Sequence, residues 1–112
     1  MITSADNELQ FLPLGGAGEV GMNLNLYGYG PAGSEKWLMI DLGVTFNNGV
    51  LPGIDVLMPN TKFIEAQKDR LLAIILTHAH EDHIGAVQYL WPKLRCPIYA
   101  TPFTLSVLNS KL

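Results

Sequence analysis

The chain has 112 residues, 48% of them hydrophobic and 15% charged, which excludes an intrinsically disordered sequence and is typical of one small domain with a packed core. Its formal net charge of −3 at pH 7 gives no indication of the basic surface that nucleic-acid binding requires, so we expect any such surface to lie outside this segment. The single cysteine, Cys96, excludes an internal disulfide framework and is expected to be a small buried hydrophobe.

Three features of the sequence predict where the protein resides. The longest apolar run is far shorter than the roughly 20 residues that a membrane-spanning helix needs. Residues 1–8 contain neither the basic segment nor the apolar core of a signal peptide. The lone cysteine fits a reducing compartment. We therefore expect a cytoplasmic protein that does not associate with membranes.

The N-terminal part of the chain predicts three strands. Residues 9–14 form a first strand that ends at a pair of glycines. Residues 23–29 alternate polar and apolar side chains, which is typical of a half-buried strand. Residues 30–34 have the composition of a turn, and residues 36–41 form a third strand that ends in the carboxylate of Asp41. This order predicts the start of a β-meander.

The middle of the chain predicts a long loop followed by a short helix. Residues 43–59 contain an Asn-Gly pair, a Pro-Gly pair and a further proline, which together exclude a regular element. Asn60 or Thr61 can cap a short helix that runs to Lys68. The side chains expected to face inward from this helix are Phe63, Ile64 and Ala66.

The last third of the chain predicts alternating strands and helices. Residues 71–76 are a continuous apolar run, which is typical of a buried strand. A helix is expected from Ile84 to about Leu90, and a short strand over residues 97–100. Thr101 can cap a final helix that has Pro102 at its first position.

All three histidines of the chain lie in residues 77–83, Thr-His-Ala-His-Glu-Asp-His, directly after the buried strand. Side chains two residues apart in extended backbone point the same way, so His78 and His80 can converge on one metal ion. As the chain turns towards the helix, Asp82 and His83 point in a new direction and can serve a second ion, roughly 3.5–4 Å from the first as in two-metal hydrolases. Imidazole and carboxylate donors favour Zn²⁺, with Mn²⁺, Mg²⁺ or Fe²⁺ as alternatives.

An alternative interpretation treats these polar residues as the ordinary start of a helix. Asp82 could act as an N-cap and Glu81 could be a solvated acid. Isolated surface histidines do not explain why an apolar strand brings every histidine of the chain to one point. The metal-binding interpretation is therefore preferred.

The glycine-rich segment at residues 16–21 matches the dinucleotide-binding pattern Gly-x-Gly-x-x-Gly, and Asp41 follows at about the expected distance. That pattern requires a helix after the glycines, because the helix N-terminus binds the phosphates. Here the next stretch has a strand period and contains Gly28, Gly30 and Pro31, which would break a helix. The segment is better explained as a tight turn, in which Glu19 and Asn23 have structural roles.

The pattern His-x-His-x-Asp-His after an apolar strand resembles the signature of the metallo-β-lactamase superfamily. The flanking segments narrow the resemblance to the ribonuclease J family, which is a β-CASP nuclease family within that superfamily. The resemblance extends from about Phe11 to Leu112. The segments that carry it are residues 12–23, 38–43, 53–55, 59, 68–70, 83–86 and 97–101.

The resemblance implies an α/β (α+β) fold in which residues 1–112 are the N-terminal portion of a metallo-β-lactamase-like domain, the first half of an αββα sandwich. No linker or second domain is expected within the chain. In the resembled superfamily the aspartate at the position of Asp41 supports the histidine loop by orienting a metal-bound imidazole. The interpretation from the residues alone is an exposed acid at a strand end.

The resemblance also implies a function for a longer parent protein: metal-dependent hydrolysis of RNA by 5′-to-3′ exonuclease action, with endonuclease action in addition. A hydroxide held by two ions would attack phosphorus, and Asp82 would help to manage the proton of this nucleophile. The superfamily pattern requires a further histidine and a bridging aspartate, and this chain has no fourth histidine. The segment alone is therefore expected to be inactive, and the complete protein to form homo-oligomers.

Two other functions remain open at this point. The first is a different hydrolase on the same scaffold, of the β-lactamase, thioesterase or glyoxalase type, because one fold supports many chemistries. The second is a non-catalytic zinc-binding module that functions at this length.

Overall fold

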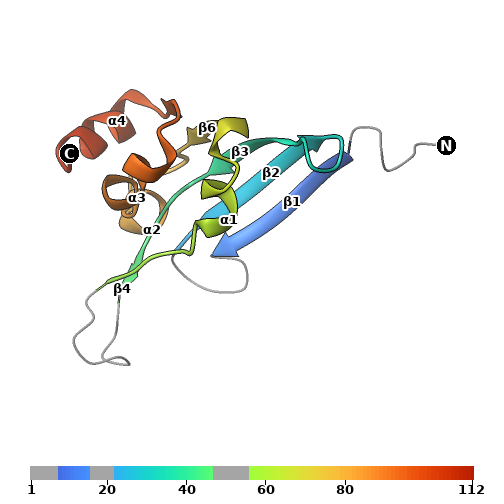
Figure 1. Ribbon diagram of the computed structural model, residues 1–112. Helices are drawn as coiled ribbons and strands as arrows, with labels where there is room; N and C mark the ends of the chain where they lie inside the picture. The colour runs from blue at the N-terminus through green and yellow to red at the C-terminus, as the bar shows by residue number, and fades with distance from the viewer. Residues whose placement is uncertain (1–7, 16–21, 47–55) are drawn as a thin grey trace.

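The computed structural model describes residues 8–15, 22–46 and 56–112 (Figure 1). A five-stranded sheet, in the order β1-β2-β3-β6-β7, forms the centre of the described molecule. Its strands are β1 (Glu8–Gly15), β2 (Leu24–Gly30), β3 (Lys36–Ile40), β6 (Leu71–Ile75) and β7 (Ile98–Tyr99). A separate pair of short strands consists of β4 (Thr45–Phe46) and β5 (Val56–Leu57).

The first three strands pair antiparallel and form the predicted meander. Leu24 and Leu26 of β2 are completely buried, whereas Tyr27 and Tyr29 point to the opposite face and are exposed. Gly28 lies under the ring of Trp37, where a Cβ atom would be 2.6 Å from the indole. The alternation in the sequence therefore predicted both the strand and its buried side.

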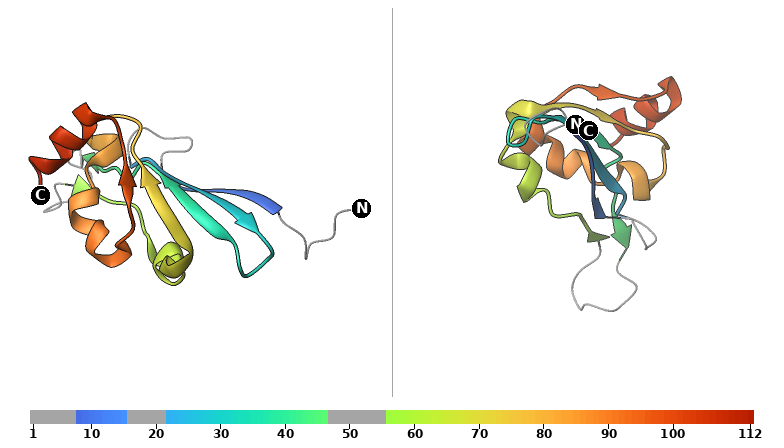
Figure 2. Two further views of the ribbon diagram at one scale, coloured as in Figure 1. Left: turned by 90° about the horizontal axis from the view of Figure 1, so that it is seen from above. Right: turned by 90° about the vertical axis from the view of Figure 1, so that its right-hand side faces the viewer.

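The second half of the sheet is parallel, because β3 pairs with β6 and β6 pairs with β7 in the same direction. The connection from β3 to β6 contains helix α1 (Lys62–Glu65) and the 3-10 turn η1 (Lys68–Arg70). The connection from β6 to β7 contains helices α2 (Glu81–Ile84) and α3 (Val87–Leu94), and α4 (Pro102–Asn109) ends the chain. Figure 2 shows α1 and α3 on the same side of the sheet, and these two helices are in contact.

The hydrophobic core lies between the sheet and these helices. Trp37, Met39 and Ile74 enter it from β3 and β6, and each is at most 2% exposed. The helices contribute Ile64, Ile84, Val87, Leu90, Leu94 and Leu108. Cys96 belongs to the same cluster, which confirms its prediction as a small buried hydrophobe.

The opposite face of the sheet remains exposed in the described residues. Leu9, Tyr29 and Leu72 are 75%, 54% and 52% exposed. Together with Tyr27, Lys36 and Leu38 they line a shallow hollow on this face. An αββα sandwich has a second sheet, and the five strands here are arranged as one sheet with helices on one side. The chain thus has a mixed α/β architecture consistent with part of a metallo-β-lactamase fold.

Several sequence predictions are corrected by the structure. The predicted loop over residues 43–59 includes the paired strands β4 and β5, and residues 47–55 lie outside the described part. The helix predicted to reach Lys68 ends at Glu65, and a 3-10 turn follows. Ile64 is buried as expected, but Phe63 is 43% exposed and Ala66 is also exposed. Such a short helix buries only one side chain, because a single turn presents too little surface to the core.

The helix predicted to end near Leu90 consists of α2 and α3, and α3 continues to Leu94 through Pro92. Proline removes one backbone hydrogen bond, but Leu90 and Leu94 are both buried, so the last turn is retained by packing. Arg95 ends the helix in the left-handed conformation, with φ of 49°. The cap of α4 is confirmed, since Thr101 Oγ1 accepts a hydrogen bond from the backbone N of Thr104 at 3.3 Å. The glycine-rich segment at residues 16–21 lies outside the described residues.

Candidate metal centre

The histidine-rich segment runs from the end of β6 into α2. His80 is the N-cap residue of α2 and has extended backbone, with φ of −80° and ψ of 154°. Asp82 is the second residue of the helix, so the alternative interpretation of Asp82 as the N-cap is wrong. Glu81 forms an ion pair with Lys111, which connects the segment to the C-terminal end of the described molecule.

A short stretch after β3 holds this segment in place through the backbone. The N of Leu42 donates to the O of His83 at 2.8 Å, and the N of Ala86 donates back to the O of Leu42 at 3.0 Å. Between these bonds, Gly43 lies so close to the segment that a Cβ atom would be 1.8 Å from the O of Asp82. Only glycine fits at this position, because any side chain would overlap the backbone of α2.

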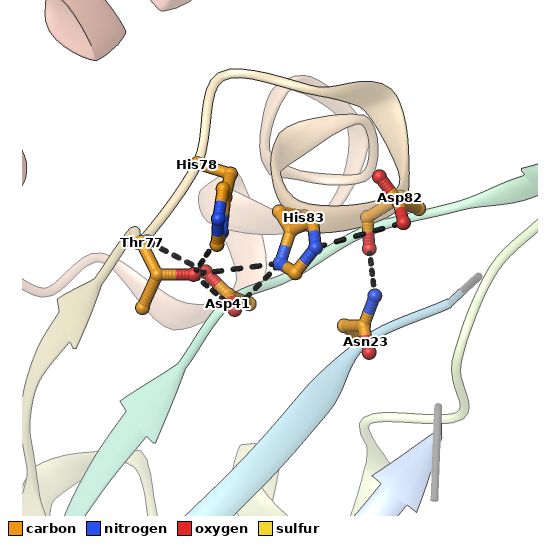
Figure 3. Close-up of polar contacts among 6 residues, drawn as sticks. All are labelled: Asn23, Asp41, Thr77, His78, Asp82 and His83. Atoms are coloured by element: carbon orange, nitrogen blue, oxygen red, sulfur yellow. Dashed lines mark hydrogen bonds and ion pairs between the residues drawn. The ribbon is translucent and has the colours of Figure 1, made fainter. Parts of the chain in front are cut away.

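Asn23 is a second support, although the sequence predicted for it only a structural role in the glycine loop. Its backbone N and its side-chain Nδ2 both donate to the O of Asp82, at 3.0 and 2.9 Å (Figure 3). Its own carbonyl accepts from the N of Gly43 at 3.0 Å. Asn23 therefore ties the beginning of β2 to both the Gly43 stretch and α2. An asparagine directly before a strand gives no sequence signal for such a long-range contact.

Asp41 is buried, with 4% exposure, and its carboxylate lies among the residues of the segment. Oδ2 is 2.8 Å from Nδ1 of His83, and Oδ1 accepts from the backbone N of Thr77 at 2.7 Å. The hydroxyl of Thr77 lies 2.9 and 2.7 Å from the two carboxylate oxygens. The interpretation of Asp41 as an exposed strand-end acid is therefore wrong. The predicted role of Asp41 in orienting an imidazole requires a hydrogen bond of this kind to His83.

The backbone of Asp41 is in the left-handed region, with φ of 66°. This conformation is costly for residues other than glycine, although aspartate and asparagine adopt it more readily than most. Asp41 also donates its backbone N to the O of Ile75 at 2.8 Å, which extends the pairing of β3 with β6. The strained conformation turns the side chain towards Thr77 and His83 at the end of the sheet, as Figure 3 shows. Strain held in this way by surrounding bonds is typical of functional sites.

The three imidazole rings lie near one another. The ring centroids of His78 and His83 are 4.5 Å apart, and those of His78 and His80 are 6.3 Å apart with nearly parallel planes. Nδ1 of His78 is 3.0 Å from Oγ1 of Thr77. Nε2 of His83 is 3.5 Å from Oδ2 of Asp82. The structure therefore gathers His78 and His83 around Thr77 and Asp41, with Asp82 beside His83 and His80 near His78.

The donor chemistry of the group fits a zinc-type ion, because neutral imidazoles and carboxylates are its usual nitrogen and oxygen ligands. In the described ranges, 8–15, 22–46 and 56–112, no three His, Cys, Asp or Glu side chains converge closely enough to hold an ion. The assignment of His78, His80, Asp82 and His83 as ligands stays a prediction. None of the described helices combines the length and hydropathy that crossing a bilayer requires.

Comparison with known proteins identifies the class to which this fold and site belong. Residues 26–109 match the family described as the metallo-beta-lactamase superfamily. The chain therefore belongs to the metallo-β-lactamase superfamily. Most of the described sheet, the Asp41 stretch and the whole histidine segment lie within the matched residues.

Within this class the chain is similar to proteins named Ribonuclease J. It is 57% identical to the Ribonuclease J of Sinorhizobium meliloti over 106 residues, which are 95% of this chain and 19% of that protein. The Ribonuclease J of Helicobacter pylori is 40% identical over 103 residues, which are 92% of this chain and 14% of that protein. Ribonuclease J 1 of Streptococcus pyogenes is 36% identical over 111 residues, which are 99% of this chain and 19% of that protein. The chain thus spans a fifth or less of the curated relatives it matches, and the resemblance to ribonuclease J is confirmed.

Proposed function

We propose that the protein containing this chain is a metal-dependent ribonuclease of the ribonuclease J type. It would hydrolyse phosphodiester bonds of RNA from the 5′ end, with endonuclease action in addition. The observation that carries this proposal is the 57% identity to the Ribonuclease J of Sinorhizobium meliloti across 95% of this chain. The matching family supports a hydrolase scaffold that depends on metal.

The proposed ligands divide between two ions. His78 and His80 would hold one ion, and Asp82 and His83 would hold the other, with zinc as the preferred metal and Mn²⁺ or Mg²⁺ as alternatives. When bound, such ions lower the pKa of water and stabilise negative charge on phosphate oxygens. Two tetrahedral ions need more donors than these four residues supply. We therefore propose that the remaining ligands come from other parts of the protein and that the 112-residue segment alone is inactive.

The residues of this chain would contribute orientation and proton handling. Asp41 holds Nδ1 of His83 at 2.8 Å, which leaves Nε2 as the metal-binding nitrogen. Asp82 has a side chain that is 39% exposed, so its carboxylate is accessible for taking the proton of the attacking nucleophile. The same proposal includes RNA as the partner, a homo-oligomeric complete protein and a cytoplasmic location. The name of the relatives supports the choice of RNA.

The test uses the full-length protein and an RNA with a 5′-monophosphate, labelled at either end. Wild-type protein should release nucleotides progressively from the 5′ end, and a chelator should abolish this release until metal is restored. His80→Ala should lower the rate by roughly 10²-fold or more, because it removes a proposed ligand. Phe103→Ala, which changes a side chain that is 71% exposed on α4, is the control and should leave the rate unchanged.

Two results would contradict the proposal. The first is RNA cleavage that His80→Ala and the chelator leave unchanged. The second is hydrolysis of a β-lactam or a thioester by a protein that leaves RNA intact, which would favour a different hydrolase on the same scaffold.

A further inference from the structure

Thr77 lies at the junction of the two strands that carry the candidate site. It follows β6, and Asp41 follows the neighbouring parallel strand β3. The carboxyl ends of parallel strands meet at the same edge of a sheet, so these two residues come together there. Figure 3 shows the hydroxyl of Thr77 pointing towards Asp41 and the imidazoles of His78 and His83. Thr77 is not among the proposed metal ligands.

The hydrogen bonds of Thr77 can be assigned from the chemistry of the groups around it. An ionised carboxylate accepts hydrogen bonds and has no hydrogen to donate. The Thr77 hydroxyl lies 2.9 and 2.7 Å from the carboxylate oxygens of Asp41, so its single hydrogen is directed to that carboxylate. The same hydroxyl oxygen is 3.0 Å from Nδ1 of His78. Because its hydrogen is already used, it can only accept a hydrogen bond in this contact. The hydrogen of this contact must therefore be on Nδ1 of His78.

The same reasoning applies directly to His83. Its Nδ1 is 2.8 Å from Oδ2 of Asp41, and the carboxylate again can only accept. In the neutral form both rings then carry hydrogen on Nδ1 and have an unprotonated Nε2, which in His83 lies 3.5 Å from Oδ2 of Asp82. One buried carboxylate thus sets the tautomers of two imidazoles, His83 directly and His78 through the hydroxyl of Thr77.

We propose that Thr77 is a positioning residue for His78. Its hydroxyl donates to Asp41 and accepts from Nδ1 of His78, which keeps the hydrogen of His78 on Nδ1 and leaves Nε2 of His78 as the metal-binding atom. This inference rests on the proposed metal-binding role of His78. The backbone N of Thr77 already bonds to Oδ1 of Asp41 at 2.7 Å, so the loop remains attached when the hydroxyl is absent. The hydroxyl therefore has a role that can be separated from holding the loop.

The first experiment measures tautomers in the metal-free, full-length protein with histidine labelled by ¹⁵N in the ring. Long-range ¹H–¹⁵N correlation spectra are recorded at about pH 8, where imidazole is mostly neutral. Loss of signals in His78→Gln and His83→Gln assigns the two rings. Wild-type protein and Thr77→Ser should show His78 protonated on Nδ1. Thr77→Val, which keeps the shape and lacks the hydroxyl, should move His78 towards the Nε2-protonated tautomer and leave His83 unchanged.

The second experiment measures zinc affinity by competition with a chelator. Thr77→Val should bind zinc about 10-fold more weakly, and Thr77→Ser should match wild type, as for other groups that orient metal-bound imidazoles. Wild-type His78 protonated on Nε2 would overturn the proposal without any variant, and so would an unchanged tautomer or affinity in Thr77→Val. Because the tautomers are measured without metal or RNA, this outcome is independent of whether the protein is a ribonuclease.

Discussion

At the scale of single residues, the site depends on Asp41 more than its sequence position indicates. The family resemblance predicted a histidine partner for Asp41, whereas the residues alone predicted an exposed acid, and the left-handed φ of 66° has no signature in the sequence. The conformation exists because bonds to Ile75, Thr77 and His83 hold it from several sides. A residue that is both strained and fully bonded is more consistent with a functional role than with packing alone.

Asp41→Asn should weaken zinc binding by roughly 10–100-fold and change stability little. Asparagine tolerates the left-handed conformation, so the backbone cost is similar. Its amide oxygen can still accept from Thr77, but the NH₂ group then faces Nδ1 of His83 and favours the tautomer with hydrogen on Nε2. A chelator competition measures the affinity, and urea unfolding measures the stability. Asp41→Ala, the control, should lose about 1–3 kcal/mol of stability in addition. Wild-type affinity in Asp41→Asn would contradict the orienting role.

Cys96 provides a prediction about pH. Burial raises the pKa of the Cys96 thiol above its ordinary value, against a smaller lowering by a backbone hydrogen bond. Between the unfolded and the folded pKa, the unfolded chain has lost the thiol proton and the folded chain has kept it. Unfolding then releases a proton, so this group lowers stability as pH rises above about 8.5. From neutral pH to a pH above about 8.5, the free energy of unfolding should therefore fall more for wild-type protein than for Cys96→Ala. Urea unfolding with reductant present measures this difference. Parallel curves for the two proteins would contradict this.

At the scale of elements, the sequence predicted the strands and helix starts that are determined by neighbouring residues in the chain. The alternation in β2 and the apolar run in β6 set the strands, and Thr101 before Pro102 set the start of α4. Contacts between distant parts of the chain decided the rest. The pairing of β4 with β5 and the continuation of α3 through Pro92 depend on partners that no local window contains. The same holds for the site, where the His78–His83 cluster was predicted but the bonds of Asn23 and Thr77 were not.

Gly43 tests how closely the stretch after β3 must approach α2. Gly43→Ala should destabilise the protein by roughly 3 kcal/mol, because its Cβ would lie 1.8 Å from the O of Asp82 and force the helix away. Gly33→Ala is the comparison without steric overlap: its φ is +82° and nothing lies within 4 Å, so its loss of about 1–2 kcal/mol is a backbone cost that Gly43→Ala does not share. Urea unfolding compares the two variants. A loss of less than about 1 kcal/mol in Gly43→Ala would mean that α2 moves at little cost, and the stretch would then not fix the position of Asp82.

At the scale of the whole molecule, the sheet has one face in the core and one face that no other described element covers. The helix-covered face carries the completely buried side chains of β2 and β3, such as Leu26 and Met39. The open face carries apolar side chains over several strands, and the rings of Phe11 and Tyr27 pack on it with centroids 5.1 Å apart. Contiguous exposed apolar surface of this kind is uncommon on a stable monomer and favours association. Its position, opposite the helices, is where a second layer would complete a sandwich.

The 112-residue polypeptide studied alone should therefore associate with itself through this open face. Sedimentation velocity over a concentration series should show a rising average mass, and the variant Leu9→Glu/Leu72→Glu should stay monomeric at the same concentrations. Leu9 and Leu72 are both more than half exposed and line the hollow beside Lys36. The new carboxylates therefore cost little stability in the monomer, whereas association through this face would bury them at a high cost. Tyr89→Glu/Phe103→Glu is the matched control, since it adds the same charge and removes exposed apolar side chains from α3 and α4. If both double variants suppress association equally, net charge is the cause and the open face is not the contact surface.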